Sequence, residues 1–161
     1  MGIDPGLNTT GYAVISRAGG KLNLIEAGVV KSRPRDELPM KLKEIGDGVG
    51  EIIAAHPIDL MALEQLFSHY ERPRTAILMG HARGVICCAA AGAGIPVSHF
   101  EPTRVKKVMT GNGRAPKSQM QQAVQLQLSL TSIPEPADVA DAMAIALCGH
   151  YLAGNDLMSV N

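Results

Sequence analysis

The hydrophobic period of the chain changes near residue 40, and this change limits the folds that the sequence can adopt. Residues 10–16 and 21–30 are rich in β-branched and aliphatic side chains, and Ala18-Gly19-Gly20 between them is typical of a hairpin turn. After residue 40, apolar side chains recur at helical spacing. They are Leu42, Ile45, Val49, Ile52 and Ile53. A hairpin followed by a helix favours a sheet with helices packed on it.

A short apolar run at residues 58–63 follows this helix, after His56-Pro57. A helix that leads into such a run predicts a parallel strand buried on both faces. Residues 2–4 form a further strand that ends at the turn Asp4-Pro5-Gly6, and residues 95–99 form a fifth. Four more helices are expected at residues 75–93, 102–110, 117–128 and 136–152. The predicted fold class is α/β, with one five-stranded mixed sheet flanked by helices.

Length and composition fit one domain spanning residues 1–161, because a chain of this size buries roughly 70% of its unfolded surface. The longest uncharged stretch, residues 84–100, is too short and too interrupted for a membrane span. Cys87, Cys88 and Cys148 form no C-x-x-C pair, so we expect three reduced core thiols in a cytoplasmic protein.

The formal net charge of zero conceals an uneven distribution along the chain. Residues 1–65 contain seven basic and nine acidic side chains, residues 66–117 contain eight and two, and residues 118–161 contain four acidic and no basic ones. Ordinary scatter in a small sample would give a similar pattern. The alternative is a polyanion bound across one face by the basic middle, with carboxylates gathered round cations.

Four carboxylates occupy positions that packing does not explain. Asp4 ends the first strand and Glu64 follows the apolar run, so both lie at carboxyl ends of strands predicted to be parallel, where ligands bind. Asp138 and Asp141 are three residues apart on an otherwise apolar helix and share one face. Pro136 suits the first position of that helix. A nearly buried helix does not carry two carboxylates on one face without a group that neutralises them.

Each carboxylate also has an ordinary structural explanation, as a turn former, a strand-edge residue or a helix cap. Taken together, four oxygen donors without a His or Cys select hard cations, Mg²⁺ or Mn²⁺, rather than zinc. Two such ions can hold the attacking water and the leaving oxygen of a phosphodiester in line.

With further motifs, these residues resemble the RuvC-type Holliday-junction resolvases, which are endonucleases of the ribonuclease H-like superfamily. The resemblance covers essentially the whole chain. The matching segments are Gly2-Ile3-Asp4-Pro5-Gly6 with Thr10-Gly11-Tyr12; Leu63-Glu64-Gln65-Leu66-Phe67; Gly80-His81-Ala82-Arg83-Gly84-Val85; Val105-Lys106-Lys107, Gly111-Asn112-Gly113 and Lys117-Ser118-Gln119; and Ala137-Asp138-Val139-Ala140-Asp141-Ala142.

The resemblance implies a ribonuclease H-like fold in which Asp4, Glu64, Asp138 and Asp141 are catalytic and bind two Mg²⁺ or Mn²⁺ ions. It implies a homodimeric bacterial cytoplasmic enzyme that cuts four-way junctions by paired symmetric nicks. The products would carry 5′-phosphate and 3′-hydroxyl ends, in homologous recombination and repair of DNA damage. A branch-migration motor complex is an implied partner. Family members usually have several residues before Gly-Ile-Asp, so we expect the natural start to lie upstream of Met1.

By the same resemblance, Lys106 and Lys117 approach DNA phosphates and Phe67 stacks on bases at the junction centre. Ring side chains followed by arginines in residues 67–74 independently suit stacking on an unpaired base. Solvated lysines and an aromatic lid on the core are the alternative interpretations. The full set of expected DNA contacts is Phe67, Tyr70, Arg72, Arg74, Arg104, Lys106, Lys107, Arg114 and Lys117.

The helix at residues 75–93 is rich in small side chains and either packs tightly on the sheet or forms a two-fold interface. An isologous dimer suits a junction with two-fold symmetry, because two related cuts are needed. We favour this helix as part of the interface.

Three other functions compete with junction resolution. Another ribonuclease H-like nuclease, such as a ribonuclease H or a YqgF-type protein, would share the carboxylates and differ only in substrate. An ATP-binding fold of the actin and sugar-kinase type would need two such domains and a longer chain. A non-catalytic junction-binding module would have no physical reason to keep four converging charges.

Metal binding would change the net charge that DNA meets. Two divalent ions would bring the neutral monomer to about +4. We therefore expect DNA affinity near neutral pH to depend strongly on bound metal.

Overall fold

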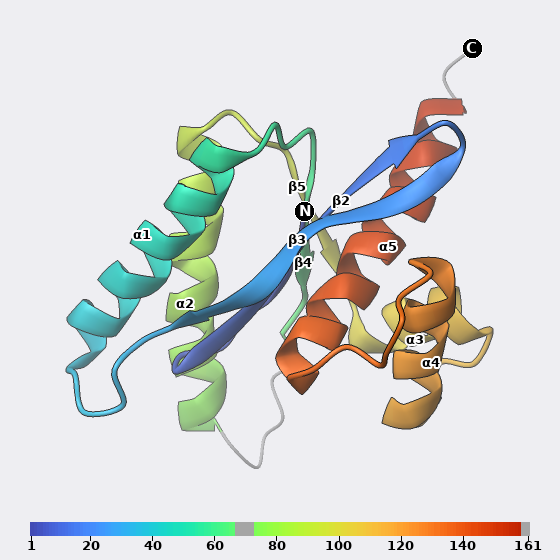
Figure 1. The fold of residues 1–161 in the computed structure, drawn as a ribbon. Helices are drawn as coiled ribbons and strands as arrows, with labels where there is room; N and C mark the ends of the chain where they lie inside the picture. Colours follow the sequence, from blue (N-terminus) through green and yellow to red (C-terminus); the bar gives the residue numbers. More distant parts are fainter. Residues whose placement is uncertain (67–72, 159–161) are drawn as a thin grey trace.

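The computed structural model describes residues 1–66 and 73–158, which form a five-stranded mixed sheet with helices on both faces (Figure 1). The strand order is β3-β2-β1-β4-β5, with β1 antiparallel to β2 and parallel to β4. The strands are β1 (Gly2–Asp4), β2 (Thr9–Ala18), β3 (Lys21–Lys31), β4 (Met61–Glu64) and β5 (Val97–Phe100). The mixed sheet predicted from the sequence is confirmed, including the parallel pairing of β1 with β4. The structure adds that β5 is parallel to β4.

Helices α1 (Leu38–Ala55) and α2 (Pro73–Gly92) cover one face of the sheet (Figure 1). Helices α3 (Pro102–Thr110), α4 (Lys117–Gln127) and α5 (Ala137–Met158) cover the other. All five lie where the sequence pattern placed them. Helix α5 begins one residue later than expected, and the Pro136 carbonyl accepts the N–H of Val139 at 3.0 Å. Pro136 therefore precedes the first helical residue.

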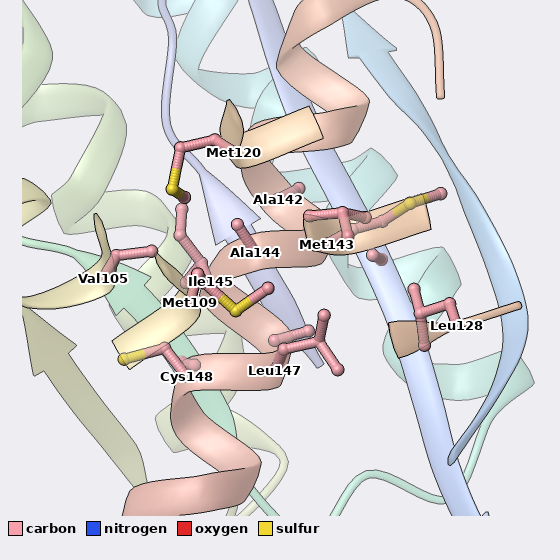
Figure 2. Close-up of a cluster of buried hydrophobic side chains, with 14 of the residues drawn as sticks. Val105, Met109, Met120, Leu128, Ala142, Met143, Ala144, Ile145, Leu147 and Cys148 are labelled. Carbon is pink, nitrogen blue, oxygen red and sulfur yellow. The ribbon is translucent and has the colours of Figure 1, made fainter. Parts of the chain in front are cut away.

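Helix α5 is the centre of the larger core cluster, and its residues 142–149 are all buried. Figure 2 shows Val105 and Met109 of α3 and Met120 of α4 around Ile145. A fully buried Ile or Leu stabilises a fold by about 1.5–3 kcal/mol. Helices α3 and α4 are thereby held beside the first turns of α5.

On the opposite face, α1 and α2 cover Ile3 and Leu63 of the two central strands. Only part of α2 takes part in this packing. Cys88 is exposed and Cys87 half-buried, whereas Cys148 is buried. The expectation of core thiols is therefore right for Cys148 and wrong for Cys88, because Cys88 lies on the outer face of α2.

Helix α2 combines length with apolar composition. Within the described residues, Arg74–Gly92 is long and apolar enough to cross a membrane, and only 17% of this stretch is buried. Length and composition alone are weak evidence for a membrane span.

Glycine at position 2 permits the close approach of α5 to β1. A Cβ atom there would lie 2.3 Å from the backbone nitrogen of Ala146 and 2.4 Å from the carbonyl oxygen of Ala142. Both contacts are with helix backbone, which cannot rotate away as a side chain can. A larger residue would push α5 off the sheet.

We predict that Gly2→Ala destabilises the protein by about 1–3 kcal/mol through overpacking. The thermal midpoint should fall by roughly 2–4 °C for each kcal/mol. Gly50→Ala is the matched control, because nothing lies within 4 Å of a Cβ at that position in α1. This control should stabilise the protein by about 0.5–1 kcal/mol. Equal midpoints for the two variants, measured by calorimetry, would contradict the packing argument.

Candidate active site

Asp4 and Glu64 lie side by side at one edge of the sheet. In the parallel pair, Ile3 is opposite Leu63, so the next residues in each strand are Asp4 and Glu64. Neighbouring strands are about 4.8 Å apart. Since alternate residues of a strand share a face, Asp4 points to the same side as Gly2, which packs on α5.

Helix α5 brings Asp138 and Asp141 to the same edge. Gly11 is the β2 partner of Asp4, and a Cβ on Gly11 would lie 2.1 Å from the Asp138 carbonyl oxygen. The first turn of α5 therefore lies directly over the β2 residue paired with Asp4. Asp141 is one turn farther along the helix and is half-buried. Its negative charge acts on Glu64.

Burial and neighbouring negative charge perturb the ionisation of the two strand-end carboxylates, Asp4 and Glu64. Burial, followed by the charges of Glu64, Asp141 and Asp138, raises the pKa of Asp4 from 3.8 to about 7. Burial and the charge of Asp141 also raise the pKa of Glu64. The charges of Asp138, Asp141 and Glu64 therefore all act on Asp4, and the nearby cations compensate this repulsion only in part.

Lys117 is the cation in direct contact with this group. Its Nζ lies 3.2 Å from Asp141 Oδ2, and its charge lowers the pKa of Asp4. Lys117 is the first residue of α4, so the packing of α4 on α5 places it. Lys106 of α3 acts on the other side, where its charge lowers the pKa of Glu64.

The loop after Asp4 is fixed from three directions. Thr10 Oγ1 donates a hydrogen bond to the Gly6 carbonyl at 2.7 Å, and Ser32 Oγ donates to the Leu7 carbonyl at 2.6 Å. Lys41 Nζ donates to Asn8 Oδ1 at 2.7 Å. These bonds hold the turn that follows the carboxylate, so Asp4 is held on a rigid backbone.

Lys41 is a positioning residue that the sequence reasoning missed. It is only 8% exposed and lies on the buried face of α1 with Ile45 and Val49. The spacing of four residues between Lys41 and Ile45 indicates from the sequence that Lys41 lies on the apolar face of the helix. A lysine in that position needs a polar partner inside the fold.

The four carboxylates are the kind of oxygen ligands that a hard cation prefers, but they are not arranged closely enough to coordinate one. Within residues 1–66 and 73–158, no three His, Cys, Asp or Glu side chains are close enough to hold a metal ion as they stand. Asp4 and Glu64 form no hydrogen bond or ion pair with another described side chain. Half-buried, mutually repelling carboxylates without partners are suited to a divalent cation, which would neutralise them and draw them together.

The remaining expected DNA contacts are divided among three parts of the chain. Phe67, Tyr70 and Arg72 lie outside the described residues. Lys107 and Arg114 are exposed on α3 and on the α3–α4 connection, and Arg74 is exposed at the start of α2. Arg104 is also exposed, and its charge acts on Cys148, two turns of α5 beyond Asp141.

A family model described as crossover junction endodeoxyribonuclease RuvC matches residues 1–150. The chain belongs to this family. The RuvC of Rhodopirellula baltica is 75% identical over 157 residues, covering 98% of this chain and 88% of the relative. The RuvC of Desulforamulus reducens is 43% identical over 148 residues, covering 92% and 90%. Both carry the name crossover junction endodeoxyribonuclease RuvC.

Solved RuvC structures have the same fold. Thermus thermophilus RuvC superposes with a TM-score of 0.87 at 32% identity, covering 96% of this chain and 95% of that one. A structure of T. thermophilus RuvC in complex with Holliday junction substrate gives 0.88 at 33% identity, covering 94% and 92%. The predicted ribonuclease H-like fold, the family resemblance and the endonuclease activity are confirmed by these matches.

We predict that the stability of the metal-free protein falls as the pH rises from about 4 to about 7. Folding raises the pKa of Asp4, so in this window the folded state binds more protons than the unfolded state, and the stability present at the lower pH is lost. The upper limit is about 1.4 kcal/mol for each pKa unit. Denaturant melts in EDTA at about pH 5 and about pH 7.5 measure this loss. Asp4→Asn should reduce it, and an unchanged loss in that variant would contradict the assignment to Asp4.

Proposed function

We propose that this RuvC protein hydrolyses phosphodiesters of four-way DNA junctions, with Asp4, Glu64, Asp138 and Asp141 as its metal-binding catalytic set. The observation that carries the proposal is the convergence of these carboxylates from β1, β4 and α5 at one sheet edge. RuvC nucleases are metal-dependent in general. We propose Mg²⁺ or Mn²⁺, two ions per site, because all four donors are carboxylate oxygens.

Bound divalent ions would supply a water nucleophile and stabilise charge on the leaving oxygen, giving 5′-phosphate and 3′-hydroxyl ends. The residues of the chain have separate tasks. Asp4 and Glu64 hold fixed positions because strand pairing and the pinned loop set their backbone. Asp141 is ion-paired with Lys117, so metal binding there competes with the lysine and would release its Nζ.

Lys106 and Lys117 flank the carboxylates from α3 and α4 and are our candidates for binding the phosphates beside the cut. A lysine beside a cleaved phosphodiester stabilises the charge of the transition state. We extend the DNA surface to Arg74, Lys107 and Arg114, and to Phe67, Tyr70 and Arg72, which lie outside the described residues. Arg104 would meet a more distant part of the duplex.

We propose that the active enzyme is a homodimer joined through the outer face of α2. Ile77 is 62% exposed on this helix. Gly80, Gly84 and Cys88 follow at helical spacing and are also exposed. An exposed apolar stripe with small residues permits close approach of a second helix, and a two-fold axis there would give two sites for paired symmetric nicks.

The proposed role is in recombination and repair, in the bacterial cytoplasm, with the chain acting as one nuclease domain. A motor that migrates the junction is the proposed partner.

The rival within the same superfamily, a nuclease for RNA–DNA hybrids or plain duplex, shares the four carboxylates and is distinguished by substrate. Its support is weaker, because a RuvC structure in complex with a Holliday junction superposes closely on this chain.

We predict that Asp4→Asn, Glu64→Gln and Asp141→Asn each abolish Mg²⁺-dependent cleavage of a synthetic mobile junction while leaving junction binding largely intact. Each substitution removes one anionic ligand without changing the size of the side chain. Cleavage is mapped on all four strands, and affinity is measured by fluorescence anisotropy. Asp59→Asn, which lies before β4 whereas Glu64 ends it, is the control and should cleave normally. Retained cleavage in a site variant would remove that residue from the catalytic set. A preference of the wild-type protein for an RNA–DNA hybrid over the junction would overturn the proposed substrate.

We predict that Ile77→Glu converts the dimer to a monomer, because two buried like charges would face each other across the two-fold axis. Light scattering after size-exclusion chromatography measures the mass. Leu126→Glu is the matched control, since Leu126 is 79% exposed on α4, away from the proposed interface. An unchanged mass for Ile77→Glu, or the same dissociation in the control, would contradict an α2 interface.

A further inference from the structure

Arg83 of α2 is held by one side of its guanidinium group and has an unsatisfied donor on the other. Its Nη2 lies 2.8 Å from His99 Nδ1 on β5. Because arginine only donates, His99 must accept through Nδ1, in its neutral form. Nη1 of Arg83 is buried and has no hydrogen-bond partner, and it is the one such side-chain atom found in the described residues. A buried unpaired donor is costly, so this atom is expected to have a partner in the working enzyme.

Strand register places this group next to the proposed active site. His99 is the β5 partner of Leu63, and Glu64 is the next residue of β4. The charges of Arg83 and Glu64 also act on each other: burial raises the pKa of Glu64 and lowers that of Arg83, and each charge partly offsets the shift of the other group. The charge of Lys106, on α3 at the other face of the sheet, acts on Glu64 as well. Two cations from different helices therefore act on Glu64.

We propose that Arg83, anchored by His99, is a positioning residue that orients the Glu64 carboxylate for metal binding and catalysis. The free Nη1 would donate to one oxygen of the Glu64 carboxylate and leave the other oxygen available to a cation. The role needs the forked shape of the guanidinium, because one arm is used by His99 and the other by Glu64. This inference rests on the proposed function of Glu64.

The experiment compares single-turnover cleavage of a synthetic four-way junction at saturating Mg²⁺ by wild-type protein and by Arg83→Gln, Arg83→Lys, His99→Leu and His99→Asn. Loss of a group that orients a metal ligand typically lowers activity by about 10-fold to 100-fold. We expect about a tenfold loss in both Arg83 variants, since lysine keeps the charge but lacks the fork. His99→Leu should show a similar loss. His99→Asn should restore most of the rate, because its Oδ1 can accept in place of Nδ1.

One further measurement and one control variant separate positioning from other roles. Junction affinity with Ca²⁺ in place of Mg²⁺ should be unchanged in the Arg83 variants. A reduced affinity would instead make Arg83 a DNA contact and overturn the proposal. In that case the slope of log affinity against log salt concentration would fall by the amount expected for about one phosphate contact. Arg17→Gln on β2 is the matched control for loss of an arginine. If Arg83→Gln fails to fold, His99→Leu and His99→Asn, which change an exposed residue, still test whether His99 anchors Arg83.

Wild-type rates in Arg83→Gln, full activity in Arg83→Lys, or equal rates in the two His99 variants would each overturn the inference. Glu64→Gln is measured alongside to distinguish the two levels of the argument. If Glu64→Gln cleaves normally, the proposed function of Glu64 fails. If Glu64→Gln is inactive and Arg83→Gln is normal, only the role of Arg83 fails.

Discussion

The close approach of α5 to β1 and β2 is the constraint on which the rest of the structure depends. Gly2 and Gly11 leave no room between strand and helix backbone, so the helix lies directly on the sheet. This contact buries residues 142–149 and provides the surface on which α3 and α4 pack. The same contact sets the position of Asp138 over the partner of Asp4. Core packing and assembly of the proposed active site are therefore consequences of one backbone approach.

That approach has an electrostatic cost. It brings negative charge from α5 to an edge where two strand-end carboxylates are already half-buried. Burial, together with the charges of Glu64, Asp141 and Asp138, raises the pKa of Asp4 to about 7. A site of this kind destabilises the metal-free protein at neutral pH and gains stability from any cation that binds only the folded state. Lys117 and Lys106 offset part of the repulsion, and both are placed where they could also serve DNA phosphates.

The two faces of the sheet have different surroundings. Helices α3 and α4, which carry Lys106 and Lys117, lie on the face opposite α1 and α2 (Figure 1). An interface on the outer side of α2 would leave the α3–α4 face open to DNA. The uneven charge along the chain fits this arrangement, because Lys106 and Lys117 belong to the basic middle segment and the four carboxylates to the acidic flanks.

The sequence by itself determined the strands, the helices and the carboxylates at their ends, because hydrophobic period and turn residues are local signals. It also determined that Asp138 and Asp141 share a helix face. Only the tertiary structure decided that Lys41 is buried against Asn8, that Cys88 is exposed, that Lys117 pairs with Asp141 and that Arg83 reaches His99. These depend on which faces of distant elements meet, and the pattern of one segment carries no information about the side chains of another.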